Sequence, residues 1–435
     1  MRPLPALGHR DFRLFWVGQL ISLVGTWMQS VGQAWLVLEL TGSAFRLGVI
    51  GTLQFAPVLG FALLGGALSD RVRKRRLLLA TQGTLMAQAL VLAALVWAGH
   101  IRYWQMAVLA TVYGVANALD MPARQSYVAE LVDRAHLSNA IALNSAAFNG
   151  ARVVGPALAG LVVARWGSAA AFLINGVSFV AVLAALAAIR TEGRPRPRPE
   201  VGLRQELVEA LRYVAATPRV RLILGLLSVV SLFVINYNVL VPLVTRDLLG
   251  GGAHEFGLLM AAHGAGALTG ALGLALLGWS RPSPVAVVVP ALLVSAGTAA
   301  LGLSRALPLT AALLVGVGLT QILFMTGCNT SFQMIVPDAL RGRLMGLYVL
   351  VFVGVTPFGA LLVGALAQTL GAGAACLIGG GLGFALVLAL ALGSGGAGYS
   401  SASALRASPA GSDRPSSASS TMTRWIEPVN GDGPR

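Results

Sequence analysis

The chain consists of long apolar runs separated by short polar breaks along most of its length. Many runs reach about 20 residues, the length at which an α-helix crosses the hydrocarbon layer of a bilayer. The fold class predicted from this pattern is an all-α polytopic membrane protein. The twelve predicted spans have approximate cores at residues 14–38, 46–68, 77–98, 103–121, 140–164, 169–189, 222–245, 256–278, 284–303, 308–329, 343–367 and 371–393.

Two segments depart from this pattern. Residues 191–221 are charged and contain prolines, and Leu203, Leu207 and Leu211 then recur at helical spacing. This spacing predicts an amphipathic helix that lies along the membrane surface. Beyond residue 393 the chain is rich in Ser, Gly and Pro, so we expect disorder. The predicted division is an N-terminal half at 1–190, a linker at 191–221, a C-terminal half at 222–393 and a tail at 394–435.

The two halves show signs of an internal repeat. The sequence GPALAG at residues 155–160 resembles GALLVG at residues 359–364, an offset of 204 residues (359 minus 155). The same offset relates Gly114 to Gly318. Because a unit with an even number of spans keeps its orientation when repeated, the pattern predicts two parallel six-helix pseudo-repeats.

Composition and charge agree with a membrane protein. The chain is 56% hydrophobic and 11% charged, whereas soluble domains carry about 25% charged residues. The net charge of +15 would suit a nucleic-acid partner, but most basic residues fall on one side of the predicted topology. Such asymmetry sets orientation and contact with anionic lipid. We therefore expect no nucleic-acid partner and both termini in the cytoplasm.

A basic turn between the second and third spans carries a recognisable motif. It reads GALSDRVRKRR over residues 66–76, and it resembles the signature of the major facilitator superfamily. The segments at 11–16, 120–125 and 149–156 further resemble the bacterial branch of the enterobactin exporter and related drug-efflux proteins. This resemblance covers roughly residues 10 to 393.

The resemblance implies a secondary active transporter that works by alternating access in a bacterial inner membrane. Its expected activity is export of a small amphipathic compound, drug-like or siderophore-like, coupled to inward proton movement. We expect a monomer in the lipid bilayer, with no cofactor. A nutrient uptake permease and a non-transporting membrane sensor or assembly protein remain alternatives.

The resemblance also implies a cytoplasmic gate around the basic turn. Asp70 would cap a neighbouring helix, where the positive end of the helix dipole favours a carboxylate. Arg71, Arg73 or Arg75 would pair with acids in adjacent loops. The chain has Arg73 where the signature has glycine, and the alternative role of these charges is to set topology alone. The predicted gate residues are Gly66, Asp70, Arg71, Arg75 and Asp120, with Glu130 and Asp133 as further acidic partners.

One arginine falls deep inside a predicted span. Arg152 lies about 13 residues, or about 20 Å of helix, beyond Asn139. A guanidinium at this depth is costly and faces a cavity or a partner. It could bind an anionic cargo group or belong to a carboxylate relay. The alternative is a structural arginine bonded to helix carbonyls.

Polar residues also recur on one face of the first span and interrupt the seventh. A polar stripe inside a membrane should face a wet cavity or another helix, and bonding between helices is the alternative explanation. Aromatic side chains could add to a cavity lining, although core packing is commoner for Trp27, Phe148, Tyr237 and Phe324. The candidate substrate-binding residues are Ser22, Thr26, Gln29, Gln33, Arg152, Asn236 and Asn238.

No acidic residue falls at the middle of a predicted span. A proton-coupled transporter needs a titrating group within reach of its cavity. The candidates are Glu39, Asp120 and His263, for each of which a structural role is the alternative.

Enzyme chemistry is not expected. The sequence has no phosphate-binding loop of the Walker type, and its few Cys and His residues suggest no metal cluster. Cys328 and Cys376 lie within apolar runs, so we expect no disulfide. The first span is longer than a signal-peptide core, so we expect no cleaved signal.

Overall fold

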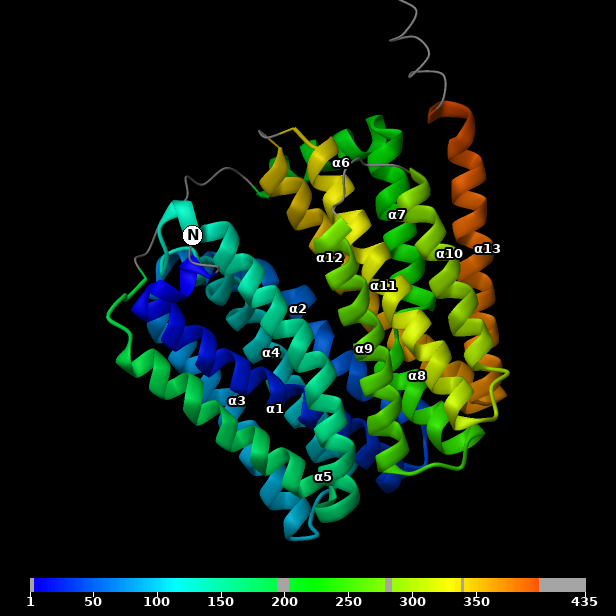
Figure 1. The fold of residues 1–435 in the computed structure, drawn as a ribbon, viewed down its shortest axis with the longest axis horizontal. Coiled ribbons are helices and arrows are strands. Elements are labelled where there is room, and N and C mark those ends of the chain that lie inside the picture. The colour runs from blue at the N-terminus through cyan, green and yellow to red at the C-terminus, as the bar shows by residue number, and fades with distance from the viewer. Residues whose placement is uncertain (1–3, 194–202, 278–283, 338–339, 399–435) are drawn as a thin grey trace, which may run out of the picture.

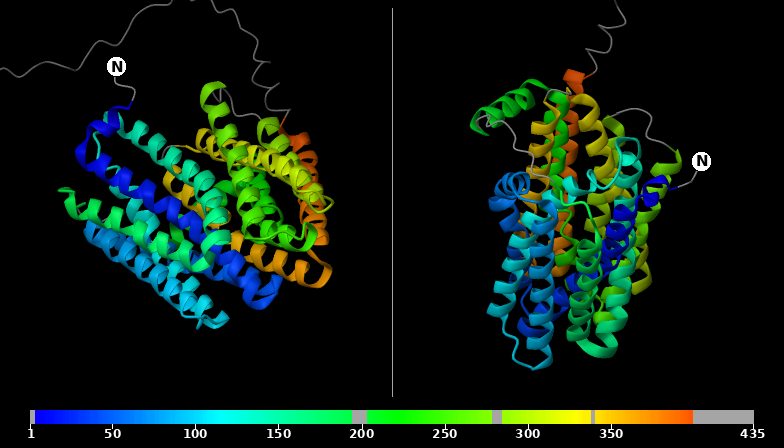
Figure 2. Two further views of the ribbon diagram at one scale, coloured as in Figure 1. Left: turned by 60° about the horizontal axis from the view of Figure 1, so that its bottom comes forward. Right: turned by 90° about the vertical axis from the view of Figure 1, so that its left-hand side faces the viewer.

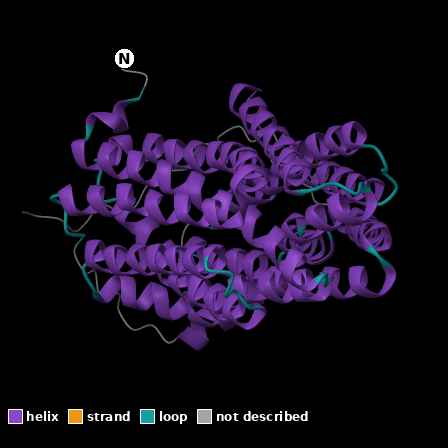
Figure 3. Ribbon diagram, turned by 90° about the horizontal axis from the view of Figure 1, so that it is seen from below, coloured by secondary structure: helices purple, strands orange, loops and turns teal. Residues whose placement is uncertain are grey.

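The computed structural model describes residues 4–193, 203–277, 284–337 and 340–398. Within them, the side chains of residues 62–71, 203–207, 275, 277, 341–343 and 394–398 are not described. All regular secondary structure in these ranges is helical (Figure 3). The predicted all-α fold class is therefore confirmed. The predicted tail, apart from the end of its last helix, lies outside the described residues.

The N-terminal half contains six spans. Its elements are η1 (Pro5–Gly8), α1 (Arg10–Thr41), α2 (Ala44–Arg71), α3 (Lys74–Trp97), α4 (Tyr103–Val128), η2 (Arg134–His136) and α5 (Leu137–Ala188). The long α5 holds two spans, because Gly167 interrupts it with φ 78° and ψ 172°. Glycine suits this position, since positive φ is costly for residues that carry a Cβ.

The C-terminal half contains the other six spans. Its elements are α6 (Leu203–Ala216), α7 (Pro218–Phe233), α8 (Tyr237–Leu243), the π-helical η3 (Val244–Leu248), α9 (Ala253–Leu277), α10 (Pro284–Leu301), α11 (Leu307–Ile335), α12 (Arg341–Leu370) and α13 (Ala372–Gly398). The segments α7, α8 and η3 together form one interrupted span. Helix α7 begins at Pro218, before the predicted boundary at residue 222. Helix α13 ends at Gly398, after the predicted boundary at residue 393.

Length and hydropathy alone recover ten candidate spans among the described residues. One of them, Arg134–Ala188, contains the two spans of α5. Helix α1 is not among the ten, although it is 32 residues long. Its polar residues lower its hydropathy. With α1 counted and α5 divided, a helix lies at each of the twelve predicted spans.

The two halves lie side by side, with α2 packed on α12 and α5 packed on α9. We call the end at which α1 begins and α2 ends the basic face, and the other end the opposite face. In Figure 1 the halves approach each other at the opposite face and diverge toward the basic face. The amphipathic α6 lies across the end of the C-terminal half, beside α7 and α12 (Figure 2).

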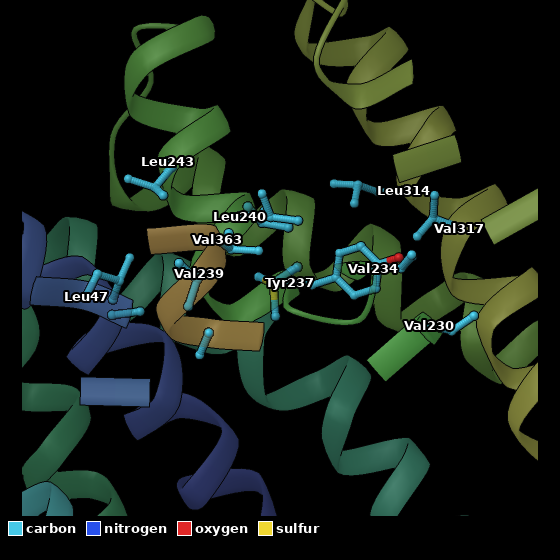
Figure 4. Close-up of a cluster of buried hydrophobic side chains, with 14 of the residues drawn as sticks. Leu47, Val230, Val234, Tyr237, Val239, Leu240, Leu243, Leu314, Val317 and Val363 are labelled. Carbon is cyan, nitrogen blue, oxygen red and sulfur yellow. The ribbon is translucent and has the colours of Figure 1, made fainter. Parts of the chain in front are cut away.

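A hydrophobic cluster surrounds the interruption between α7 and α8. Tyr237 lies at its centre, with Leu314 and Val317 of α11 on one side (Figure 4). Leu47 of α2 belongs to the same cluster, so the core continues from one half into the other near the opposite face. The break in the helix is therefore packed in apolar surroundings.

Candidate functional site

The two halves make close backbone contact toward the opposite face. A Cβ added to Gly257 of α9 would lie 2.3 Å from the Cα of Gly160 on α5. At the second seam, a Cβ added to Gly48 of α2 would lie 3.2 Å from the Cα of Gly364 on α12. Small residues let helices approach in this way. No cargo-sized passage fits between backbones at these distances.

Toward the basic face, α5 and α11 carry exposed apolar side chains. On α5, Ile141 is 55% exposed and Phe148 is 46% exposed. On α11, Met334 is 56% exposed. The halves therefore make backbone contact toward the opposite face, and their helices diverge toward the basic face (Figure 1).

Arg152 lies beside the contact between α5 and α9. Its backbone carbonyl is 2.8 Å from a Cβ built on Gly264 of α9, so α5 and α9 are in close contact at this residue. Arg152 as a whole is partly buried, and its guanidinium donates a hydrogen bond to Gln321 of α11 at 3.3 Å. It also lies 5.7 Å from the ring centroid of Trp27 on α1, within the range of a cation–π interaction.

His263 of α9 completes this constellation. Its Nε2 lies 2.8 Å from Oε1 of Gln321, so one amide oxygen serves both His263 and Arg152. The imidazole packs against Tyr237 of α8, with ring centroids 4.6 Å apart. The hydroxyl of Tyr237 is hydrogen-bonded to Thr298 of α10 at 2.9 Å. The central site, as we name Trp27, Arg152, Tyr237, His263 and Gln321, therefore joins five helices from both halves.

Among the side chains that the structure describes, no acid pairs with the arginine of the central site. None of the described ion pairs involves Arg152, and its hydrogen-bond acceptor is a neutral amide. Sequence reasoning found Arg152 and His263 but missed Gln321. Gln321 could have been predicted as a site residue because it lies near the middle of an apolar run, where an amide without a hydrogen-bond partner is energetically costly.

The polar stripe of α1 lies differently from the prediction. Gln29 accepts a hydrogen bond from Asn175 of α5 at 2.7 Å and donates one to Gln88 of α3 at 3.0 Å. These partners all belong to the N-terminal half. Ser22 and Gln33 are likewise buried, at 3% and 2% exposure. Bonding between helices, and not a cavity lining, accounts for Gln29.

Thr26 and the two asparagines of the interrupted span have local roles. Thr26 donates to the carbonyl of Ser22 one turn earlier, at 2.9 Å. Asn236 donates to the carbonyls of Ser231 and Leu232, which the end of α7 leaves without helical partners. Its buried amide therefore stabilises the break. Asn238 remains partly exposed on α8.

Asp120 is fully buried inside the N-terminal half. It accepts hydrogen bonds from Thr81 and Gln82 of α3, both at 2.8 Å. Its cationic partner is Arg124, one turn along α4, at 2.6 Å. Arg124 in turn donates to Gln19 of α1 at 3.1 Å. Asp120 is thus the centre of a polar cluster within one half, and not a loop partner of Arg75.

The described part of the basic turn makes other contacts. Lys74 pairs with Glu130 at 2.8 Å, and Arg73 pairs with Glu192 at 2.8 Å. Arg75 donates to the carbonyls of Leu186 and Ala187 at the end of α5, at 2.6 and 2.7 Å. Of the three arginines offered as partners of acids, Arg73 pairs with an acid that was not predicted, and Arg75 binds backbone carbonyls. The side chains of Gly66, Asp70 and Arg71 lie outside the described residues.

Two other acids lie near the ends of α1. Glu39 is exposed near the opposite face and accepts a hydrogen bond from the Trp35 indole at 2.6 Å. Asp11, at the basic face, accepts from the amides of Arg190 and Thr191 and from the Thr191 hydroxyl. Burial alone would raise the pKa of Asp11, but these hydrogen bonds lower it below its ordinary value.

A possible metal-binding group, which the sequence did not predict, lies at the basic face. His9, Asp133 and His136 bring one ligand atom each within 4.8 Å of one another. A groove also runs between α3 and α4, lined by Leu77, Thr81, Val108 and neighbouring residues. This groove involves one half only, so it is separate from the central site.

Two six-helix halves that meet around a polar central site define a transporter of the major facilitator superfamily. Residues 1–399 match the model of the family described as transmembrane secretion effector, and the chain belongs to this family. It is a multi-pass membrane protein and not an enzyme.

Several curated proteins are similar over most of the chain. The multidrug efflux pump Tap of Mycobacterium tuberculosis is 28% identical over 367 residues, covering 81% of this chain and 86% of Tap. The staphyloferrin A transporter of Staphylococcus aureus is 25% identical over 265 residues, covering 60% and 66%. The macrolide efflux protein A of Streptococcus pyogenes is 24% identical over 276 residues, covering 61% and 66%.

Solved structures share the fold. A bacterial homolog of the human lysosomal transporter Spinster, in an inward-facing and unoccupied conformation, superposes with a TM-score of 0.70 at 12% identity, covering 91% of this chain and 96% of that one. The POT family transporter PepTSo gives a TM-score of 0.71 at 12% identity, covering 88% and 97%. At these identities the likeness establishes the fold.

Proposed function

We propose that this protein exports small amphipathic compounds across a bacterial inner membrane by alternating access. The observation that carries the proposal is the position of Arg152, which lies beside the contact between α5 and α9 and bonds to Gln321 of the other half. A polar group at this depth, reached from one side and joined to both halves, is where a transporter of this fold binds its cargo. Residues 1–190 and 222–393 would be the two moving units.

The direction of transport is argued from charge and from the relatives. Many basic residues lie at the basic face, among them Arg10, Arg13, Arg73, Lys74 and Arg75. The positive-inside tendency therefore assigns this face, and both termini, to the cytoplasm. Cargo would enter from the cytoplasm in the observed state. Two of the relatives are named as efflux proteins, which favours export.

We propose that inward proton movement drives export. Asp120 is the group that we propose binds and releases the proton. Among the three candidates, Asp120 is the buried carboxylate, and Arg124 holds it close to α1 and α3. Protonation would break this pair and loosen the contacts among three helices. Glu39 is exposed near the opposite face, and His263 shares its hydrogen bond with the cargo site.

An accumulation assay in bacteria that lack their own efflux pumps tests the proposal. Expression should lower the cellular content of at least one compound in a broad amphipathic panel, and a protonophore should remove the effect. Raised accumulation would indicate uptake instead. Content equal to the empty vector for every compound would contradict the exporter proposal and favour a non-transporting protein.

A further inference from the structure

We propose that the central site binds the anionic group of its cargo, so that the preferred compounds are amphipathic acids. This inference rests on the proposed export function. Its basis is the pairing of Arg152 with a neutral amide in a region whose described helices supply no carboxylate to it. An arginine without a counter-ion at this depth is costly, and an arriving anion would relieve that cost.

The geometry around Arg152 suits a carboxylate or sulfonate with an apolar body. Gln321 occupies one guanidinium nitrogen at 3.3 Å, and the planar fork offers further donors. Trp27 and Phe148 contact each other edge to face, with ring centroids 5.7 Å apart, on the same side as the guanidinium. An amphipathic acid could place its charge on Arg152 and its apolar part against these rings.

The path to Arg152 also favours anions. The acids of the N-terminal half whose side chains are described contact other residues. These contacts are Asp11 with backbone amides, Glu39 with Trp35, Asp120 with Arg124, Glu130 with Lys74 and Asp133 with His9. The basic face carries an excess of positive charge, which raises the local concentration of anions. A negative cell interior would further drive an anion outward, by about 2.3 kcal/mol per charge at 100 mV.

Paired compounds test the inference. Each probe is an amphipathic carboxylic acid, such as a dansylated hydrophobic amino acid, offered beside its methyl ester and its amine analogue. Export is measured in pump-deficient cells, and thermal stabilisation is measured on the purified protein. The key variant is Arg152→Gln. The control is Arg165→Gln, which removes an exposed arginine from the same helix.

We expect the acids to be exported and to stabilise the protein, and Arg152→Gln to weaken acid binding at least tenfold, about 1.4 kcal/mol. Arg165→Gln should behave as the wild type. Export of esters or amines as efficient as that of acids, unaffected by Arg152→Gln, would overturn the anion inference and leave the exporter proposal standing. If no member of any charge is exported or bound, both fail.

A separate observation points to a metal site at the basic face. Nε2 of His9 lies 3.0 Å from Nδ1 of His136 and 3.8 Å from Oδ2 of Asp133. Ligands of a tetrahedral Zn²⁺ ion at about 2.1 Å are about 3.4 Å apart. We infer that these three residues bind Zn²⁺ or a similar divalent ion, with water completing the coordination.

This site would join two segments that are distant in sequence. His9 precedes α1, whereas Asp133 and His136 belong to the loop between α4 and α5. The amide of Ala6 already donates to Asn139 in the same region, at 3.1 Å. A bound metal would therefore fasten the start of the chain to this loop.

Calorimetric titration of the untagged, purified protein with ZnCl₂ tests the site. We expect one ion per chain at micromolar affinity or tighter, and at least tenfold weaker binding by His9→Ala and by His136→Ala. His100→Ala, which removes an exposed histidine elsewhere, should bind as the wild type. Absence of binding, or equal binding by all three variants, would overturn the inference.

Discussion

Arg152 of α5 and Gln321 of α11 form a hydrogen bond of 3.3 Å between the two halves of the protein. His263 bonds to the same amide oxygen at 2.8 Å. The Gln321 amide oxygen thus holds a cation and an imidazole together where the two halves meet. The proposed transport cycle depends on this arrangement.

The first prediction concerns Gln321. Its replacement by leucine removes the acceptor that positions both Arg152 and His263. Because hydrogen bonds to charged groups contribute about 1.5–3 kcal/mol, the apparent affinity for cargo should fall by about ten- to a hundredfold. Transport rates over a range of cargo concentrations measure it. Gln333→Leu, on an exposed position of α11, is the control and should leave the affinity unchanged.

The second prediction concerns the basic turn. Lys74 is 2% exposed and pairs with Glu130, whereas the side chains of Arg73 and Glu192 are 47% and 53% exposed. Lys74→Met should lower the unfolding free energy by about 2 kcal/mol or more, because it removes a buried ammonium that is hydrogen-bonded to Glu130. Arg73→Met should change it by about 1 kcal/mol or less. Equal losses in a denaturation assay would contradict this contrast.

The third prediction concerns the close contact at Gly257. An alanine there would place its Cβ 2.3 Å from the Cα of Gly160. This overlap should prevent closure at the opposite face and reduce transport at least tenfold. Gly150→Ala on α5 is the control, because its Cβ would meet no heavy atom within 4 Å. Wild-type transport by Gly257→Ala would show that this contact is not needed.

The fourth prediction concerns Asp120. Asp120→Asn should lower the unfolding free energy by about 2–4 kcal/mol, since Arg124 loses its carboxylate. The double variant with Arg124→Gln should recover part of this loss. If Asp120 also couples transport to protons, folded Asp120→Asn protein should transport without responding to an imposed pH gradient. A retained response, measured in proteoliposomes, would assign Asp120 a structural role alone.

The sequence predicted the fold well because apolar runs of spanning length leave few alternatives in a bilayer. It also identified Arg152 as a candidate site residue, because the energetic cost of a guanidinium deep in the bilayer follows from its depth alone. Side-chain direction was harder to predict. The polar residues of α1 share one helical face, but periodicity does not tell whether this face meets a cavity or another helix. Gln29 meets α3 and α5 because Asn175 and Gln88 lie opposite it.

The partners of the charged side chains were the feature hardest to predict from the sequence. Arg124 lies one turn from Asp120, so a local partner was available to the acid. Arg75 instead binds carbonyls at the end of α5, far away in the chain. Such long-range contacts depend on how the helices are packed, which hydropathy does not encode.

Cross-linking the two halves at the opposite face tests alternating access most directly. Ser43 donates to Gln368 at 2.8 Å and joins α12 to the turn before α2. Cysteines at both positions, linked by a short reducible thiosulfonate reagent, should hold this face closed. The native Cys328 and Cys376 are buried, and each single cysteine variant serves as a control. We predict that transport in vesicles stops on cross-linking and returns on reduction. Transport that continues unchanged in fully cross-linked protein would contradict the account.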